Sequence, residues 1–187
     1  MSDKPRFHRA AALPVVRELL KHLEPVTDRL IVAGSLRRKK LEVGDIEFVF
    51  IPKREERQLD LVTVGKVDLA AEVIERLVTG GVLAKRENVN GGTAWGDKNK
   101  LAVHVTSGIP VDLFFATEDN WWNYLVCRTG PKECNARIAT AAQAKGWKWQ
   151  PYKKGFTDGQ GRLVRATSER HVFELAGLPY QDPCERA

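Results

Sequence analysis

Apolar residues recur at helical spacing in four segments of the chain. The pattern predicts helices over residues 10–23, 68–79, 132–145 and 169–176. A residue that ends helices follows each segment: Pro25, Gly80, Gly146 and Gly177. Thr167 or Ser168 would cap the last helix at its N-terminus.

Four further segments are short, apolar and rich in strand formers. They predict strands over residues 29–33, 45–51, 101–106 and 109–116. The last two are joined by Ser107-Gly108, which is a strong β-hairpin signal. Residues 53–57 and 88–98 are interpreted as loops, and residues 147–166 as a small hairpin. The composition changes after about Asn120, where a second structural unit is expected to begin.

Two carboxylates lie on one face of the strand predicted at 45–51. Residues two apart in a strand point to the same side, so Asp45 and Glu47 project together and the apolar residues between them project into a core. Neighbouring carboxylates repel each other, and their proximity is costly unless a cation lies between them. The pair therefore indicates a binding site for a cation.

A third carboxylate, Asp112, lies inside the apolar segment of residues 111–115. A buried carboxylate is costly without a partner. If this strand pairs with the strand at 45–51, Asp112 can join Asp45 and Glu47. Three such groups can bind two divalent ions that activate a hydroxyl and stabilise a leaving phosphate, and oxygen-only ligands select Mg²⁺ or Mn²⁺ over Zn²⁺.

The composition narrows the class of protein. A length of 187 residues with 43% hydrophobic and 29% charged content fits an ordinary globular protein of one domain or two small ones. The net charge of +6 favours an anionic partner such as a nucleic acid or a nucleotide. The three cysteines and four histidines show no zinc-ligand spacing. With no signal peptide and no apolar run of membrane-spanning length, we expect an intracellular protein without a membrane partner.

Several of these segments together resemble family X DNA polymerases. The segment GSLRRKKLEVGDIEF at residues 34–48 resembles the nucleotidyltransferase signature of that family, and VDLFF at 111–115 resembles the strand with its third metal-binding aspartate. RTGPKECNARIATAAQAKG at 128–146 and FELAGLPYQDPCER at 173–186 resemble the beginning and the end of the family's thumb subdomain. The resemblance extends over about residues 10–186.

The resemblance implies an α+β fold in two parts. A nucleotidyltransferase palm, with a mixed sheet and helices on one face, would comprise residues 1–120, and a small α+β thumb would comprise residues 121–187. The implied reaction is addition of deoxynucleotides to a primer 3′-hydroxyl, with short-gap filling in DNA repair as the role. The implied partners are primer–template or gapped DNA and nucleoside triphosphates, bound by a monomer.

The same resemblance implies roles for individual residues. Two Mg²⁺ ions, for which Mn²⁺ can substitute, would be held by the catalytic carboxylates Asp45, Glu47 and Asp112. The triphosphate would contact Gly34, Ser35, Arg38 and Gly44. The sugar and base would contact Thr129, Gly130 and Asn135.

The chain departs from the family pattern at five positions. Glu47 stands where an aspartate is usual, and Arg128 where an aromatic residue precedes the Thr-Gly turn. Ala136 and Ala139 stand in place of a lysine and an arginine on the template side, and Pro110 in place of an arginine near the primer end. A template-independent nucleotidyltransferase, acting on a nucleic-acid 3′ end or a small acceptor, is therefore the alternative function. A non-catalytic nucleic-acid-binding module is disfavoured, because clustered acids repel phosphates.

Some residues have two interpretations that the sequence leaves open. Arg37 could bind phosphate or pair with a surface acid, and Lys98 and Lys100 could contact nucleic acid or belong to a solvated loop. The tryptophans could stack on bases or pack in the core: Trp121, Trp122, Trp147 and Trp149.

Overall fold

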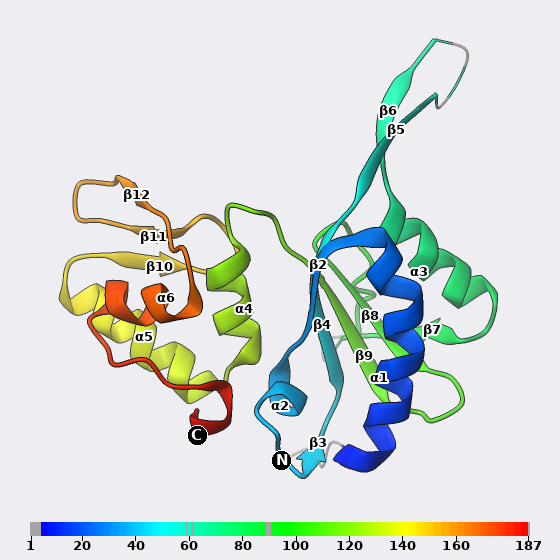
Figure 1. Cartoon of the computed structure of the whole chain (residues 1–187), viewed down its shortest axis with the longest axis horizontal. Helices are drawn as coiled ribbons and strands as arrows, with labels where there is room; N and C mark the ends of the chain where they lie inside the picture. The colour runs from blue at the N-terminus through cyan, green and yellow to red at the C-terminus, as the bar shows by residue number, and fades with distance from the viewer. Residues whose placement is uncertain (1–4, 59, 61, 89–90, 187) are drawn as a thin grey trace.

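The structure is a computed structural model that describes residues 5–58, 60, 62–88 and 91–186. Its N-terminal region, residues 5–120, is built on a mixed five-stranded sheet in the order β2-β4-β9-β8-β7 (Figure 1). Only β4 and β9 are parallel; the other neighbours are antiparallel. The strands are β2 (Thr27–Val32), β4 (Ile46–Pro52), β7 (Leu83–Lys85), β8 (Asn99–His104) and β9 (Pro110–Phe115).

Helices α1 (Arg9–Leu23) and α3 (Leu69–Thr79) cover one face of this sheet. Their apolar stripes pack with alternate residues of the strands in one cluster, to which Leu19, Phe48 and Ile74 each contribute a fully buried side chain. Asp68 caps α3 by accepting a hydrogen bond of 2.9 Å from the backbone N–H of Ala71. The periodicity thus predicted both helices to within one residue of their observed beginnings.

The opposite face of the sheet is covered by α4 (Trp121–Thr129), which the sequence did not predict. Tyr124 and Leu125 pack against Val49 and Phe114 of the sheet, while Val126 belongs to the separate core of the C-terminal region. Because α4 is buried against two cores, apolar residues surround it, and the one-sided stripe of a surface helix is missing. The predicted domain boundary after residue 120 falls at the start of this shared helix and stays a prediction.

The C-terminal region, residues 121–186, contains two more helices and a small sheet. Helices α5 (Lys132–Ala144) and α6 (Glu169–Ala176) pack with strands β10 (Lys148–Gln150), β11 (Gly155–Thr157) and β12 (Leu163–Val164) around Phe156 and Phe173. The predicted hairpin at 147–166 is a three-stranded antiparallel sheet. Ser168 caps α6 by accepting from His171 N at 2.9 Å.

A two-stranded hairpin of β5 (Arg54–Gln58) and β6 (Val64–Asp68) protrudes from the N-terminal region (Figure 1). The interpretation of residues 53–57 as a loop was wrong. All five residues of β5 are exposed and polar, so the strand is held by its backbone pairing with β6 and leaves no apolar signal in the sequence. Residues 88–98, predicted as a loop, form no named strand or helix within their described part.

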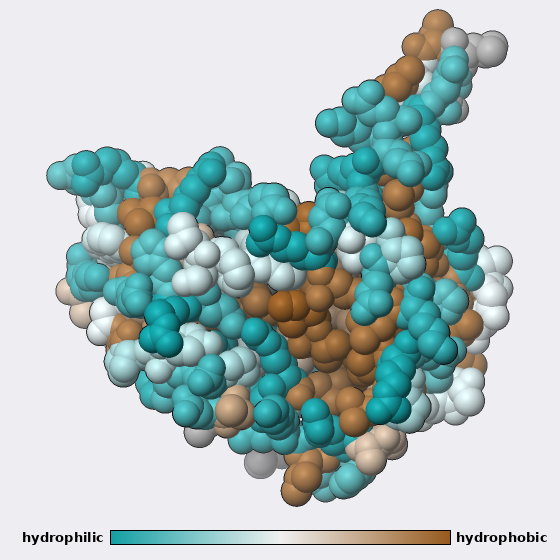
Figure 2. Space-filling model, in the orientation of Figure 1, coloured by the Kyte–Doolittle hydropathy of each residue, from teal (hydrophilic) through white to brown (hydrophobic). Residues whose placement is uncertain are grey.

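Short elements complete the fold. They are β1 (Phe7–His8), which pairs with β3 (Glu42–Val43), the single turn α2 (Gly34–Arg37), and the 3₁₀ turns η1 (Glu24–Val26) and η2 (Pro183–Glu185). Figure 2 shows an apolar surface over β2, between α1 and the C-terminal region, where β2 is the edge strand with half-buried Leu30, Ile31 and Val32. None of the helices in the described part of the chain is long and apolar enough to cross a membrane.

Candidate active site

The parallel pairing of β4 and β9 brings the predicted carboxylates together. Glu47 and Asp112 are register partners on these two strands, so their side chains emerge next to each other on the face that α4 covers further along the sheet. Asp45 precedes β4 by one residue and is two residues from Glu47. The hypothesis that the strand with Asp112 lies beside the strand with Glu47 is therefore confirmed.

Two of the three acids, Glu47 and Asp112, have a raised pKa. The pKa of Glu47 is raised to about 8, first by burial and then by the negative charge of Asp45, with Asp112 contributing further. The pKa of Asp112 is also raised, mainly by burial, although the positive charge of Arg86 opposes the shift. Carboxylates crowded in this way are typical of a site that binds multivalent cations, because a bound cation offsets the repulsion that raises their pKa.

As the side chains lie, no three His, Cys, Asp or Glu residues within the described ranges converge on one point that could hold a metal ion. Asp112 is turned toward Arg86, which donates a hydrogen bond to its Oδ1. Glu47 is turned toward the turn at Gly34, since a Cβ built on that glycine would lie 1.9 Å from Glu47 Oε2. The donors are nevertheless all carboxylate oxygens, which suits Mg²⁺ or Mn²⁺.

Arg86 is a site residue that the sequence did not reveal. It follows β7, and its backbone N–H donates to Leu101 O at 3.0 Å while its Nε donates to Ala102 O at 3.2 Å. These two bonds to β8 place the guanidinium at Asp112 on β9. Arg86 is 26 residues from Asp112 in the chain, and only the sheet order connects them, so no local pattern could have indicated the pair.

The predicted triphosphate residues lie around α2. Gly34 begins this turn with φ of +60°, a conformation that favours glycine, and Ser35 follows it. The Oγ of Ser35 and the Nε of Arg38 are buried and have no hydrogen-bond partner within the described part of the chain. Both residues line a hollow of about 760 Å³ that is also lined by the basic side chains of Arg6 and Lys40, neither of which was predicted.

Arg38 connects this turn to the C-terminal region. Its guanidinium donates a hydrogen bond to the backbone carbonyl of Thr129, and its Nη1 would lie 3.3 Å from a Cβ at Gly130. Burial lowers the pKa of Arg38, while the charges of Glu47 and Asp45 act in the opposite direction. Arg38 therefore lies between the carboxylates and the Thr129-Gly130 turn. Its contact with a triphosphate stays a prediction.

Arg37 makes the second connection between the two regions. It donates to Thr129 Oγ1 at 2.7 Å and forms a bidentate pair with Glu169 at 2.8 and 2.6 Å. Arg186, which is fully buried, contributes two further bonds to the same carboxylate at 3.3 and 3.4 Å. Of the two interpretations of Arg37, the structure thus supports pairing with an acid, although this acid is buried on α6 and not at the surface.

The remaining predicted residues are placed as follows. Thr129 is fully buried, with its hydroxyl engaged by Arg37. Asn135, in the first turn of α5, donates from Nδ2 to Cys127 O at 2.8 Å, and its Oδ1 is buried without a hydrogen-bond partner among the described residues. Gly44 lies just before β4, and a Cβ there would meet no atom within 4 Å.

The tryptophans are packing residues. Trp121 belongs to the cluster beneath α4, and Trp122, Trp147 and Trp149 pack against the buried clusters. Lys100 is buried and forms an ion pair with Glu75 at 3.6 Å, so it is not a free cation.

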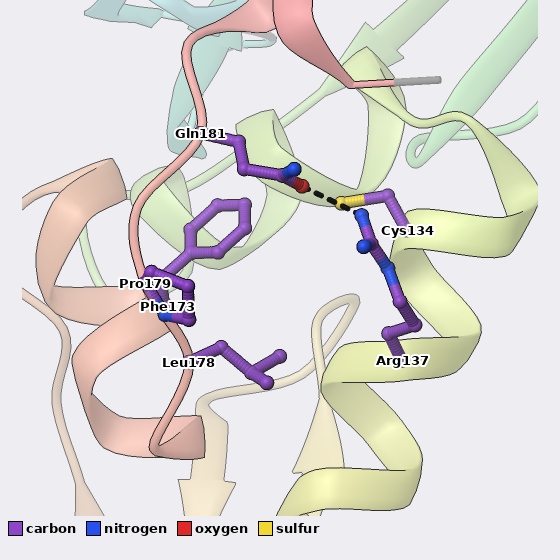
Figure 3. A pocket seen from close by; sticks show the side chains of 6 residues that line it. All are labelled: Cys134, Arg137, Phe173, Leu178, Pro179 and Gln181. Atoms are coloured by element: carbon purple, nitrogen blue, oxygen red, sulfur yellow. Dashed lines mark hydrogen bonds between the residues drawn. The ribbon is translucent and has the colours of Figure 1, made fainter.

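A small pocket of about 50 Å³ lies between α5 and the segment that follows α6 (Figure 3). Arg137 donates across it to Gln181 Oε1 at 2.6 Å, and Cys134, Phe173 and Leu178 line its wall. This space is too small for a nucleotide. Cys134 is buried in the core of the C-terminal region and is a packing residue.

Comparison with known proteins adds one match. Residues 124–187 match the family model of the DNA polymerase beta thumb, which spans most of the C-terminal region. No curated protein matches the chain. The thumb match supports a polymerase beta-like, DNA-binding role, and it supports the identification of the chain as a family X polymerase-like protein.

Proposed function

We propose that the chain is a DNA-directed DNA polymerase of the family X type, which adds deoxynucleotides to a primer 3′-hydroxyl and fills short gaps during DNA repair. The observation that carries this proposal is the β4–β9 register, which sets Glu47 beside Asp112 on the sheet face next to the polymerase beta-like thumb. The enzyme would act as an intracellular monomer on gapped or primer–template DNA with deoxynucleoside triphosphates.

In this proposal Asp45, Glu47 and Asp112 hold two Mg²⁺ ions, which Mn²⁺ can replace. When bound, the ions lower the pKa of the primer hydroxyl and neutralise charge on the triphosphate. The raised pKa of Glu47 supports this role, because a carboxylate that is costly to ionise among protein groups alone gains most from a cation.

The chain's own residues would position the triphosphate and the base. Ser35 Oγ, which lacks a partner in the described part of the chain, would donate to a phosphate oxygen, and Arg38 would neutralise the leaving pyrophosphate with its remaining donors. Asn135, whose Oδ1 is likewise without a partner there, would contact the incoming nucleotide. The contacts from Arg37 and Arg38 to Thr129 would keep the thumb beside the triphosphate.

A template-independent nucleotidyltransferase is the second candidate. The observation in its favour is the surface of α5, where Ala136 is exposed and Ala139 is half-buried, so that neither position offers a basic side chain to a template strand. Templating would then depend on fewer contacts, which weakens the preference for a correct pair.

The deciding experiment is single-nucleotide insertion on a duplex with a one-nucleotide gap and on the matching single strand, with each deoxy- and ribonucleotide supplied separately. We expect insertion on the gapped duplex to follow the template base with low fidelity. Some ribonucleotide should be accepted, because Arg128 replaces an aromatic residue. Insertion that ignores the template base would favour the second candidate, and no insertion with either metal would contradict both.

A further inference from the structure

Two adjoining cavities lie at the base of the β5–β6 hairpin, away from the carboxylates. One of about 330 Å³ extends along α4 and is lined by Asn120, Tyr124 and Arg128, and the other of about 300 Å³ reaches Lys66. Arg54, Asp97 and Phe115 line both. We call the combined space the hairpin groove. Most of it lies at the ends of β4 and β9 opposite to the carboxylates, where Pro52 is about 17 Å from Glu47 at the rise of a β-strand. Arg128 lines its inner end and is close enough to Glu47 and Asp112 for its charge to oppose the rise in their pKa.

The groove is lined by cations that have no acidic partner. Arg54, Lys66 and Lys98 are exposed, and none of them forms an ion pair with any residue that the structure describes. Other basic residues nearby are neutralised: Arg57 pairs with Glu72 at 2.9 Å, and Lys100 pairs with Glu75. Two acids also line the groove, Asp97 and Asp68, of which Asp68 caps α3, so the lining cations outnumber the lining acids.

Aromatic side chains accompany these cations. The Tyr152 ring is 51% exposed at the edge of the groove and contacts Tyr124 edge-on at 5.3 Å between centroids. The guanidinium of Arg128 lies 3.5 Å from the centroid of the Phe114 ring and 4.8 Å from that of Tyr152. An accessible ring beside a planar cation offers stacking surfaces to an unsaturated ring system.

We propose that the hairpin groove binds an unpaired single strand of nucleic acid. Phosphates would contact Arg54, Lys66 and Lys98, and a base would stack at Tyr152. Each cavity has the volume of a small-ligand site and suits one nucleotide unit, and an exposed ring such as that of Tyr152 stacks on a base only where the base is unpaired. The choice of a nucleic acid over another polyanion rests on the proposed function, whereas binding itself requires no catalysis.

The test measures binding of a fluorescent oligothymidylate to three proteins over a range of salt concentrations. They are the wild type, a groove variant Arg54→Gln/Lys66→Gln/Lys98→Gln, and a control variant Arg17→Gln/Lys21→Gln/Arg76→Gln. The control residues are equally exposed and equally charged but lie on α1 and α3, on the other face of the sheet. Both variants lose three positive charges, so a difference between them reports position and not net charge.

We expect the groove variant to bind at least tenfold more weakly than wild type at moderate salt, with the slope of log affinity against log salt reduced by about 2, as for three lost single-strand phosphate contacts. The control variant should change affinity less than threefold. Equal losses in the two variants would overturn the proposal, because the binding would then be a general effect of charge.

Photocrosslinking of the wild type with an oligothymidylate that contains 5-iodouracil locates the bound strand. We expect adducts on Tyr152 or Phe115, and adducts confined to α5 and α6 would overturn the proposal. If the wild type binds in the groove yet inserts no nucleotide, the proposed polymerase function fails while this inference stands.

Discussion

The N-terminal and C-terminal regions of the molecule differ in net charge. Residues 1–120 carry 19 Lys and Arg against 18 Asp and Glu, whereas residues 121–187 carry 11 against 6. The nearly neutral region contains the three crowded carboxylates, and the basic region lies beside them. Because net positive charge is concentrated in the smaller region, the long-range attraction of phosphates to that region can be altered there without substituting the carboxylates.

The two regions also differ in their similarity to known proteins. The thumb family model matches residues 124–187, which contain none of the three carboxylates. Arg37 and Arg38, at α2, form hydrogen bonds with Thr129 and Glu169. They therefore connect the region that contains the carboxylates to the region that matches the thumb model. Substitutions on either side of this connection show how far one region depends on the other.

The largest effect is expected from removing one carboxylate of the N-terminal region. Asp45→Asn or Asp112→Asn should reduce nucleotide incorporation at least a thousandfold while leaving the fold intact, because each removes a ligand of the proposed metal site. Asp45→Asn should also raise stability without metal, since the charge of Asp45 raises the pKa of Glu47. Asp112→Asn should not, because it also removes the acid paired with Arg86. Primer extension and thermal unfolding in EDTA measure the two effects.

Asp28→Asn is the matched control for these variants, because Asp28 is an exposed acid of β2 outside the site. It should change neither measurement. Near-normal incorporation by either carboxylate variant in Mg²⁺ would exclude the assigned metal role.

The connection itself is tested by Arg38→Ala. Incorporation efficiency should fall by about a hundredfold, since the variant loses both a phosphate donor and the hydrogen bond to Thr129 O. Primer affinity should change little. Steady-state kinetics with the triphosphate, together with DNA binding by anisotropy, separate the two, and Lys21→Ala serves as a control. Equal losses of incorporation efficiency and primer affinity would indicate that Arg38 contacts the DNA.

On the thumb side, Glu169→Gln removes the acid that Arg37 and Arg186 share. Two guanidiniums would be left without a counter-charge, one of them fully buried, which should lower the free energy of unfolding by about 3 kcal/mol. Urea denaturation measures the change. Glu174→Gln, an exposed acid on the same helix, should be within 0.5 kcal/mol of wild type, roughly as for other surface substitutions. Similar stability of the two variants would mean that the network contributes little.

The smallest effect concerns pH. The pKa of Glu47 is raised to about 8 from an unfolded value of 4.5, so its contribution to stability is full at low pH and is lost as pH rises through 8. Glu47→Gln mimics the protonated acid. Without metal its free energy of unfolding should match that of wild type near pH 4, and its advantage over wild type should grow by roughly 2.7 kcal/mol between pH 6 and pH 9. Urea unfolding at these pH values measures this, and Glu56→Gln is the exposed control. Wild-type stability that does not change between these pH values would contradict the shift.

Local signals were sufficient for most of the scaffold. Periodicity and end residues predicted α1, α3, α5 and α6, and the Ser107-Gly108 turn predicted the antiparallel pair of β8 and β9. The carboxylate site was predicted because residues two apart in a strand share a face, and because Asp112 stood out in an apolar segment. These inferences needed only residues close together in sequence.

Features that depend on distant contacts were missed. Helix α4 is buried on several sides and has no one-sided stripe, and β5 is a strand of exposed polar residues. The pairs Arg86–Asp112 and Arg37–Glu169 join residues 26 and 132 positions apart. Their partners follow from the sheet order and from the contact between the two regions, which no local pattern encodes.

The turn at Gly34 has a consequence for natural sequence variation. A positive φ alone would still admit asparagine or aspartate at this position. Here the carboxylate of Glu47 lies where any Cβ on residue 34 would be, at 1.9 Å from its Oε2. A residue other than glycine at 34 would therefore force the Glu47 side chain into another rotamer. The two positions are expected to covary, with the shorter aspartate at 47 leaving more room for asparagine at 34.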